Sequence, residues 1–483
     1  MIKLRNIIST ILLIAFLALS SAPVRAVNLD SLVYPPLNPV TIPEIEEIQL
    51  ANGLRLYLLA DKTLPLIQAS VRIHGGSYLD PVDKIGLAEI CGSLMRSGGT
   101  AKWSSDELDD LLESIGGVAE TSIDTISGKL SLVMLSSYTD LAMEVMAELL
   151  RRPRFEKEKF EQLMLGVRSM ISRRNDRPTS IGEREFDKII YGSESPYARH
   201  VEYATVDAIS IDDLKEFHHR VFRPENVQMA IYGDIDTAKI KALVEKYFGD
   251  WEKAPEALAD FPEVNYEYVA EVSYVDLPEA NQSNVYIGHI GGRLFDEDHP
   301  HRIVMNNVLG VGFGSRLFRE VRSRAGLAYS VYGVFTANLS YPGVFYNYVS
   351  TKNDATVRAI RMIISEIKRM QTEPVSDEEL QFGKDRYLNT FVFNFDSKGK
   401  IIDRMVYYDF FGLPRDFLNK QMEAVERTTA RDVMNAAQKY LKPDLMKILV
   451  VGAVKDLDEP LEKLGYGKPL EIDVTIPEPQ KAD

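Results

Sequence analysis

The side chains best suited to bind a transition metal are few in this chain, seven histidines and a single cysteine. A zinc motif on a helix needs two histidines four residues apart, so that both lie on one face. His218 and His219 are adjacent and would point about 100° apart on a helix, which excludes that pairing. The proline within His299-Pro-His301 predicts a loop, where surface histidines are ordinary. The remaining histidines are dispersed along the chain, at His74, His200 and His289.

Alternating glycines at Gly310, Gly312 and Gly314 form a pattern that can indicate a phosphate-binding loop. No Walker lysine accompanies them, and the flanking sequence lacks the strand-to-helix context of a dinucleotide fold. We therefore expect a flexible turn, because glycine tolerates backbone angles that other residues avoid. Neither a nucleotide nor any other cofactor is predicted for this chain.

The first 26 residues have the pattern of a secretory signal peptide. Lys3 and Arg5 precede an apolar run at residues 7–19, and Val24-Arg25-Ala26 offers a small-residue cleavage site. The apolar run is shorter than the roughly 20 residues that span a bilayer, so a cleaved signal is favoured over a membrane anchor. We expect an exported protein, with the periplasm as its location, whose mature chain begins near Val27.

Composition limits the class of protein further. With 483 residues and 45% hydrophobic content, the chain can form a large core, and its length suggests two or more domains. Cys91 is the only cysteine, so an intramolecular disulfide is excluded and stability must come from the core. The net charge of −15 becomes −18 when the three cations of the signal peptide are removed, which argues against nucleic acid as a partner.

An internal repeat divides the chain into two similar halves. An alternating apolar run at residues 67–74 leads into Gly75-Gly76 and Asp80, and the same shape returns 216 residues later. Two further landmarks recur at nearly the same spacing. The matching positions are residues 284–290 with Gly291-Gly292 and Asp296, Tyr191-Gly192 with Phe411-Gly412, and Arg223-Pro224 with Lys442-Pro443. The spacing predicts two homologous domains of about 200 residues each.

Strand and helix patterns are mixed within each half without strict alternation, which predicts an α+β fold in which sheets pack against helices. A doubly wound nucleotide-binding fold is disfavoured for the same reason. Helical composition and period mark residues 106–115, 138–150, 157–174, 354–371 and 377–395. We expect a first domain at residues 44–250, an acidic proline-containing linker at 251–271, a second domain at 272–465 and a tail at 466–483.

Two segments resemble the motifs of the insulinase/pitrilysin zinc peptidases. One is Gly314-Ser-Arg-Leu-Phe-Arg-Glu-Val-Arg-Ser-Arg-Ala-Gly-Leu-Ala-Tyr-Ser-Val-Tyr332, which looks like the signature of that family's second domain. The other begins at Asp80-Pro-Val-Asp-Lys-Ile-Gly-Leu-Ala and ends at Gly98-Gly-Thr100, the frame that carries the family's zinc motif. With the repeat landmarks, the resemblance spans about residues 44 to 465. It implies two homologous α/β sandwich domains that form half of a chamber enclosing a peptide.

In the family, the motif H-x-x-E-H supplies two zinc ligands and the general base from one helix. The matching positions here are Glu89, Gly92 and Ser93, so both histidines and the base are replaced. The third family ligand, a glutamate roughly 75 residues further on, is also missing, because no carboxylate lies between Gln162 and Asn175. Glu89 and Cys91 could contact a metal, but we expect Glu89 to face the former site as a carboxylate and Cys91 to pack in the core.

The resemblance also implies a substrate-binding pair in the second domain. Arg322 and Tyr329 match the family's Arg and Tyr by their spacing and by the intervening Gly326-Leu327-Ala328. The tyrosine hydroxyl would donate to the oxyanion that forms on the scissile carbonyl, and the arginine would bind a neighbouring peptide carbonyl. Outside this motif, the two side chains would be interpreted as a helix-surface cation and a half-buried strand aromatic.

The resemblance therefore implies a chain that cannot cleave peptides alone. Our leading hypothesis is the non-zinc subunit of a heterodimeric exported metallopeptidase, in which a homologous partner with H-x-x-E-H holds the zinc and the extended peptide. The alternative is a catalytically inactive peptide-binding or scaffold protein of the same family. A displaced metal site that makes the chain an independent peptidase is disfavoured, because no clustered ligands remain.

Overall fold

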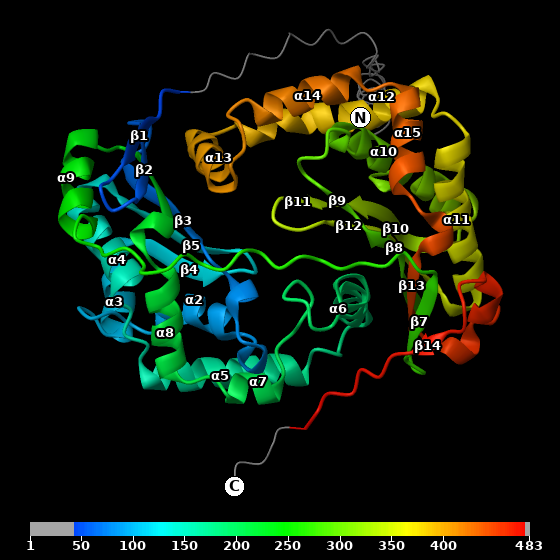
Figure 1. The fold of residues 1–483 in the computed structure, drawn as a ribbon, viewed down its shortest axis with the longest axis horizontal. Helices are drawn as coiled ribbons and strands as arrows, with labels where there is room; N and C mark the ends of the chain where they lie inside the picture. Colours follow the sequence, from blue (N-terminus) through cyan, green and yellow to red (C-terminus); the bar gives the residue numbers. More distant parts are fainter. Residues whose placement is uncertain (1–42, 479–483) are drawn as a thin grey trace, which may run out of the picture. The chain divides into compact units, whose positions relative to one another are not determined.

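The computed structural model describes residues 43–478, which lie within one compact unit. The expected signal peptide at residues 1–26 and the last five residues of the expected tail lie outside the described residues. Two six-stranded sheets dominate the fold (Figure 1). Each is built from strands of one half of the chain, which confirms the predicted mixture of sheets and helices.

The first sheet has the strand order β1-β2-β6-β3-β5-β4. Its strands are β1 (Glu46–Gln49), β2 (Arg55–Ala60), β3 (Leu66–His74), β4 (Val118–Ile123), β5 (Ser127–Leu135) and β6 (Val227–Gly233). The predicted alternating run is β3, whose side chains alternate between buried and half-buried positions. That period of two places one face of the strand against the helices of the first half.

The second sheet has the order β10-β12-β8-β13-β7-β14. Its strands are β7 (Glu271–Asp276), β8 (Gln282–Ile290), β10 (Ala328–Phe335), β12 (Val344–Lys352), β13 (Lys447–Gly452) and β14 (Leu470–Glu471). β9 (Gly292–Arg293) and β11 (Ala337–Asn338) form a separate two-stranded sheet. The predicted repeat strands occupy equivalent places, because β3 pairs with β5 and β6 just as β8 pairs with β12 and β13.

Helices cover the sheets in a similar order in the two halves. Those of the first half are α2 (Leu87–Ser97), α3 (Ser105–Ile115), α4 (Thr139–Arg151), α5 (Lys157–Ser172), α6 (Pro178–Tyr191), α7 (Tyr203–Asp207), α8 (Ile211–Val221) and α9 (Thr237–Phe248). Those of the second half are α10 (His299–Gly310), α11 (Thr356–Thr372), α12 (Asp377–Phe391), α13 (Lys398–Phe411), α14 (Phe417–Arg427) and α15 (Ala430–Tyr440). The five helical segments predicted from period are confirmed as α3, α4, α5, α11 and α12.

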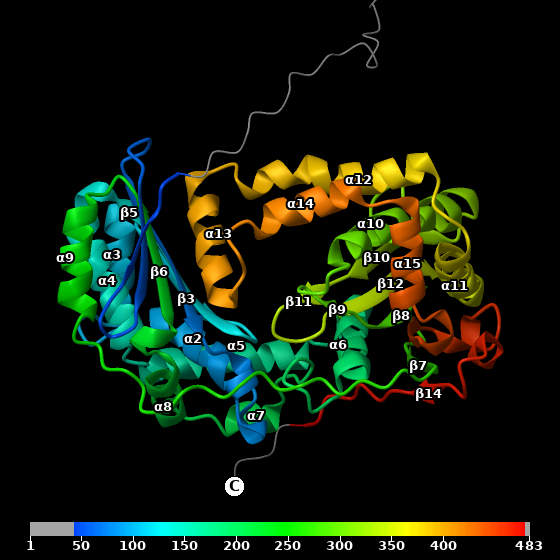
Figure 2. The same cartoon turned by 45° about the horizontal axis from the view of Figure 1, so that its top comes forward.

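One helix of each half packs against the sheet of the other half (Figure 2). α6 of the first half packs on β8 and β13 of the second sheet, where Ile181 and Phe186 join Tyr286 in a shared core. α13 of the second half packs on β2, β3 and β6 of the first sheet, where Ile402 and Val406 join a second shared core. This exchange explains why β8 is buried on both faces.

Two extended segments also connect the halves. Residues 251–270, within the expected linker, form no helix or strand, and β7 begins at Glu271. The linker lies along the first half, where the hydroxyl of Tyr78 donates to the carbonyl of Ala259 at 3.1 Å. The C-terminal tail returns to the first half, where the Asn175 side chain donates to the carbonyl of Val474 at 2.6 Å.

The loop predicted at His299-Pro-His301 is wrong, because α10 begins at His299. A proline in the first turn of a helix costs nothing, since its missing N–H would have no intrahelical partner there. His299 is only 8% exposed, so it is a core residue and not a surface histidine. Gly310 likewise ends α10 and does not lie in the turn that was expected for all three glycines.

In residues 43–478, the structure contains no helix that is long and apolar enough to cross a membrane.

Candidate functional site

The helix at the zinc-motif positions, α2, is fixed at its start by Asp80. The two carboxylate oxygens of this residue accept hydrogen bonds from the backbone N–H groups of Gly86 and Ala88, each at 3.0 Å. These donors would otherwise have no partner at a helix N-terminus. Burial raises the pKa of Asp80 to about 7, although both N–H donors oppose this shift. In the sequence, Asp80 is a repeat landmark and the first residue of the motif frame, but no sequence pattern indicates its contact with the start of α2.

Gly92, at the position of the family's general base, leaves no room for a side chain. α2 lies directly against the edge strand β4, and the Thr121 hydroxyl donates to the Gly92 carbonyl at 2.6 Å. A Cβ atom at position 92 would lie 2.4 Å from the backbone nitrogen of Ile123. A glutamate therefore cannot occupy this position unless the backbone of β4 moves.

The other positions around the motif do not converge on a common point. The Ser93 hydroxyl donates to the Glu89 carbonyl at 3.0 Å, which is a bond within the helix. Glu89 is exposed by surface area, yet loss of water and the charge of Asp124 raise the pKa of its carboxyl group. Cys91 is fully buried with a raised thiol pKa, which confirms its prediction as a core residue.

Zinc does not fit these residues. No group of three or more His, Cys, Asp or Glu side chains that could hold a metal occurs in residues 43–478. A cavity of about 100 Å³ lies beside α2, lined by Asp80, Glu89, Arg199 and His200. Burial and the neighbouring Lys188 lower the pKa of His200 to about 4, so its imidazole is neutral near pH 7. Sequence reasoning missed this cavity because His200 is distant from the motif along the chain.

Arg322 and Tyr329, the pair expected to bind substrate, lie close together in the second half. The guanidinium carbon of Arg322 lies 5.9 Å from the centre of the Tyr329 ring. Arg322 belongs to the π-helical segment Phe318–Arg324, and Tyr329 lies on the edge strand β10 where the register with β12 shifts. Wider π-helical turns and strand irregularities commonly re-aim side chains at functional sites.

Both side chains are open to solvent. Tyr329 is 75% exposed, so it is not the half-buried strand aromatic that a purely structural role would require. Arg322 is exposed as well and also lies over the Phe318 ring, at 4.7 Å from its centre. Phe313 packs edge-on against Phe318 at 5.0 Å and is itself 80% exposed. An arginine and a tyrosine hydroxyl therefore stand beside an exposed aromatic group.

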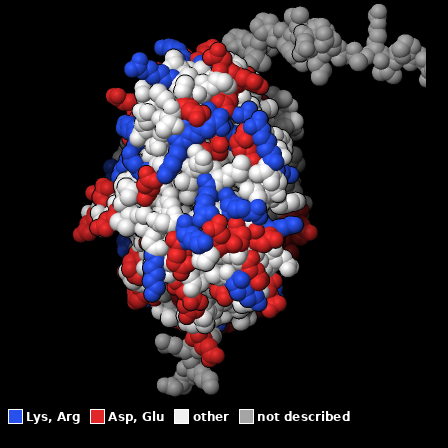
Figure 3. All heavy atoms as spheres, turned by 90° about the vertical axis from the view of Figure 1, so that its right-hand side faces the viewer, with Lys and Arg blue, Asp and Glu red and all other residues white. Residues whose placement is uncertain are grey.

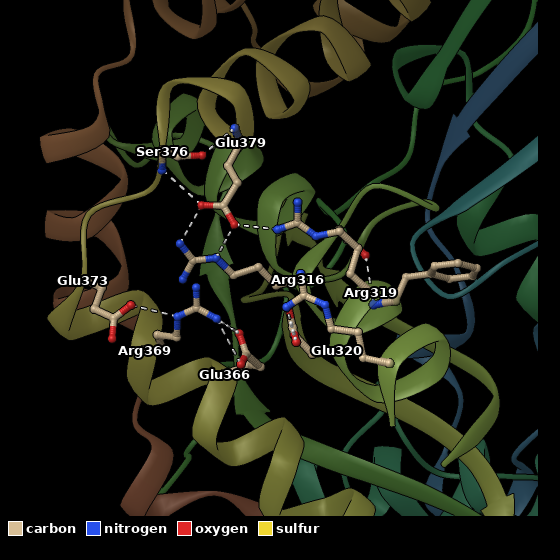
Figure 4. A network of polar contacts seen from close by, with 11 residues as sticks. Arg316, Arg319, Glu320, Glu366, Arg369, Glu373, Ser376 and Glu379 are labelled. Atoms are coloured by element: carbon tan, nitrogen blue, oxygen red, sulfur yellow. Dashed lines mark hydrogen bonds and ion pairs between the residues drawn. The ribbon is translucent and has the colours of Figure 1, made fainter. Parts of the chain in front are cut away.

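A buried ion-pair cluster fixes the segment that precedes Arg322 (Figure 4). Arg316, which is 1% exposed, binds both carboxylate oxygens of Glu379 at 2.9 and 2.8 Å. Arg319 donates to the same carboxylate at 2.7 Å. Burial raises the pKa of Glu379, but the hydrogen bonds from Arg316 and Ser376 outweigh this effect and bring it down to about 2.

The turn before this segment is closely packed. Gly312 has a φ of +87°, and a Cβ atom there would lie 2.8 Å from Nη1 of Arg386 on α12. A Cβ atom on Gly314 would lie 2.6 Å from the Phe382 ring. Sequence reasoning singled out the glycines but missed Arg386 and Glu379, since their contacts with this turn arise only from the packing of α12.

The protein consists of two α/β units with equivalent sheets. In the first unit, the helix at the zinc-motif positions packs against β4 at Gly92, and in the second unit Arg322 and Tyr329 are exposed. These features define a peptidase-like protein without the zinc motif. Comparison of the sequence with models of known protein families supports this class of protein. Residues 57–201 match the insulinase model (peptidase family M16), and residues 208–387 match the model described as the peptidase M16 inactive domain. The chain belongs to the insulinase family, peptidase family M16.

Named relatives include both peptidases and non-peptidases. An uncharacterized zinc protease, YmxG, of Bacillus subtilis is 24% identical over 74% of this chain and 87% of its own length. A non-peptidase homolog, YmxG, of Helicobacter pylori is 22% identical over 81% of this chain and 90% of its own length. The crystal structure of a peptidase M16 inactive domain from Pseudomonas fluorescens superposes with a TM-score of 0.77 at 22% identity, over 87% of this chain and all of that one.

Proposed function

We propose that this chain is the non-zinc subunit of an exported heterodimeric zinc metallopeptidase. Its partner is a homologous chain that carries H-x-x-E-H and holds the zinc, and its substrate is an extended or unfolded peptide. Arg322 and Tyr329 act in trans on that peptide. The Tyr329 hydroxyl donates to the oxyanion of the scissile carbonyl, and Arg322 binds a neighbouring carbonyl.

The observation that carries the proposal is the contrast between the two halves. The motif helix α2 is closed by β4 at Gly92, whereas Arg322 and Tyr329 are exposed, adjacent and supported by the Glu379 cluster. Groups held by a rigid support before the substrate arrives are what stabilisation of a transition-state charge requires. A chain with only a structural role has no need for an exposed tyrosine beside an exposed arginine.

Location in the periplasm belongs to the same proposal and rests on the signal-peptide pattern of residues 1–26. The non-peptidase relative from Helicobacter pylori supports a role without independent cleavage.

The test is to express this chain and a homologous H-x-x-E-H chain from the same genome, separately and together, and to assay an unfolded fluorogenic peptide with added zinc. We expect no turnover by this chain alone and turnover by the complex. Tyr329→Phe should lower the kcat of the complex by about 10²- to 10³-fold, the effect of losing one oxyanion donor. Tyr138→Phe, at another exposed tyrosine, is the matched control and should leave kcat unchanged.

Turnover by this chain alone would refute the assignment of roles. If the two chains assemble but Tyr329→Phe has the activity of the unmodified complex, the alternative of an inactive peptide-binding or scaffold protein is favoured.

A further inference from the structure

The surroundings of Arg322 are cationic in a chain whose net charge is −15. Five arginines and two glutamates lie in or against the segment between the glycine turn and β10, and the nearby Glu366 and Glu373 pair with Arg369 (Figure 4). The five arginines are Arg316, Arg319, Arg322, Arg324 and Arg386, and the two glutamates are Glu320 and Glu379. On the face drawn in Figure 3, by contrast, Lys and Arg are interspersed with Asp and Glu.

Three of these arginines are neutralised locally. Glu379 binds Arg316 and Arg319, and Glu320 binds Arg324 at 2.7 Å. Arg322 and Arg386 form no ion pair with any carboxylate of the described chain. Two exposed guanidinium groups are therefore free to bind an anionic ligand.

The two free arginines flank an apolar contact. Arg386 packs against Gly312, the next residue is the exposed Phe313, and Phe313 contacts Phe318, which lies under Arg322. Arg322 then reaches the Tyr329 ring. We refer to Arg386, Phe313, Phe318, Arg322 and Tyr329 as the cationic strip. The Phe313 ring, which is 80% exposed, offers an apolar surface beside these unpaired charges that a ligand can cover.

The strip is held in place before any ligand binds. Arg386 and Phe382 block side chains at Gly312 and Gly314, and the carboxylate of Glu379 holds the following turn. Little backbone entropy would therefore be lost in this segment when a peptide binds.

We propose, building on the proposed function, that the cationic strip selects peptides that carry a carboxylate next to an apolar side chain. The carboxylate binds Arg386, or the guanidinium donors of Arg322 that the neighbouring peptide carbonyl leaves free, and the apolar side chain packs on Phe313. Arginine is suited to this task because its planar guanidinium binds a carboxylate through two parallel hydrogen bonds. The carboxylate comes from an Asp or Glu side chain or from the C-terminus of the peptide.

The test measures direct binding by this chain alone, so it does not depend on catalysis. Fluorescently labelled peptides of one sequence would contain Glu-Leu with an amidated C-terminus, Gln-Leu with an amidated C-terminus, or Gln-Leu with a free C-terminus. We expect at least one carboxylate peptide to bind about tenfold more tightly than the neutral one at low salt, with the difference reduced at high salt. The comparison of the two carboxylate peptides identifies the source.

Arg322→Gln and Arg386→Gln should each reduce the preference for the carboxylate peptide. Arg361→Gln, at an exposed arginine that pairs with Glu459, is the matched control and should keep it. Phe313→Ala should weaken binding of the Leu peptide but not that of a Gly peptide. All four side chains are accessible to solvent, and unchanged thermal unfolding would show that each variant folds.

Equal affinity for the neutral peptide and for both carboxylate peptides would overturn the inference without any variant. The proposed function would fail separately if the complex with the zinc-bearing chain had no turnover, whatever the outcome of the peptide comparison.

Discussion

At the scale of single residues, loss of the zinc motif involves geometry as well as composition. Glu89 and Ser93 replace histidines at exposed positions of α2. Gly92 faces the β4 backbone, and the 2.4 Å separation between a Cβ atom there and the Ile123 nitrogen is far below van der Waals contact. Of the three motif positions, position 92 is therefore the obstacle to restoring the zinc motif.

Restoration of the full motif should consequently fail. In Glu89→His/Gly92→Glu/Ser93→His, we expect a loss of several kcal/mol of stability from overpacking and no stoichiometric tight zinc binding. The double variant Glu89→His/Ser93→His keeps Gly92 and should unfold close to the temperature of the unmodified chain. Thermal unfolding and metal analysis after dialysis measure both effects. A triple variant of normal stability with one zinc per chain would contradict the steric argument.

Asp80 provides a prediction of pH dependence. Its folded pKa of about 7 lies above the usual value of 3.8, so the folded protein holds a proton at pH 5 that the unfolded chain has released. The contribution of Asp80 to stability therefore falls as the pH rises from about 4 to 7. Asp80→Asn should remove this component, roughly 3 kcal/mol of the change in unfolding free energy over that range.

Urea unfolding at several pH values between 4 and 7.5 measures the effect. The exposed neighbour Asp83 supplies the control, Asp83→Asn, which should keep the pH profile of the unmodified chain. An unchanged profile in Asp80→Asn would show that its carboxyl group does not titrate in this range in the folded state.

At the scale of elements, the site depends on the junction between α12 and the π-helical segment. Glu379 has two structural roles, since it completes the capping box with Ser376 at the start of α12 and binds Arg316 and Arg319. The position of the segment that contains Arg322 therefore depends on a helix that begins more than 50 residues later in the chain. This arrangement links local capping to the geometry of the candidate site.

Glu379→Gln should destabilise the packing between α12 and the π-helical segment. The change leaves the nearly inaccessible Arg316 without a counter-charge, which typically costs about 3–5 kcal/mol for a buried pair. We also expect reduced peptide binding by the cationic strip under conditions where the variant remains folded. Glu366→Gln, which removes a carboxylate bound by the half-exposed Arg369, is the control and should cost much less. Urea unfolding and the peptide-binding assay report on the two effects.

At the scale of the whole molecule, the exchange of α6 and α13 makes the halves mutually dependent. Each sheet completes its core with a helix that belongs to the other half, and the tail adds a further connection. The linker at residues 251–270 also packs against both halves, with Phe261 beside Tyr78 of the first half and with Val264 and Tyr266 against the shared core around α6. Non-covalent packing, and not the covalent connection through the linker, therefore holds the halves together.

A protease site inserted at the exposed residues 256–257 should allow the linker to be cut without separation of the halves. After cleavage we expect both fragments to co-elute in size-exclusion chromatography. Gly182→Val should weaken this association, because a Cβ atom on Gly182 of α6 would lie 2.3 Å from the Tyr286 ring. Gly166→Val on α5 meets nothing within 4 Å and is the matched control. Separation of the cleaved unmodified chain would show that the exchanged helices do not suffice.

The sequence alone determined the periodic and positional features of this protein. Alternating runs and repeated Gly-Gly landmarks identified equivalent strands in the two halves, because one buried face per strand requires a period of two. The matching motif frame located the missing zinc ligands and the Arg322–Tyr329 pair. His299 shows the limit of local reasoning, since the proline that follows it is compatible both with a loop and with the first turn of a helix.

Only the tertiary structure decided what surrounds those positions. The closure of Gly92 by β4, the exchange of α6 and α13, and the contacts of Glu379 and Arg386 join segments that are distant along the chain. No local pattern encodes such contacts, because they depend on which faces of separate elements pack together. The sequence therefore indicated which groups are present, and the packing determined which of them remain accessible to a ligand.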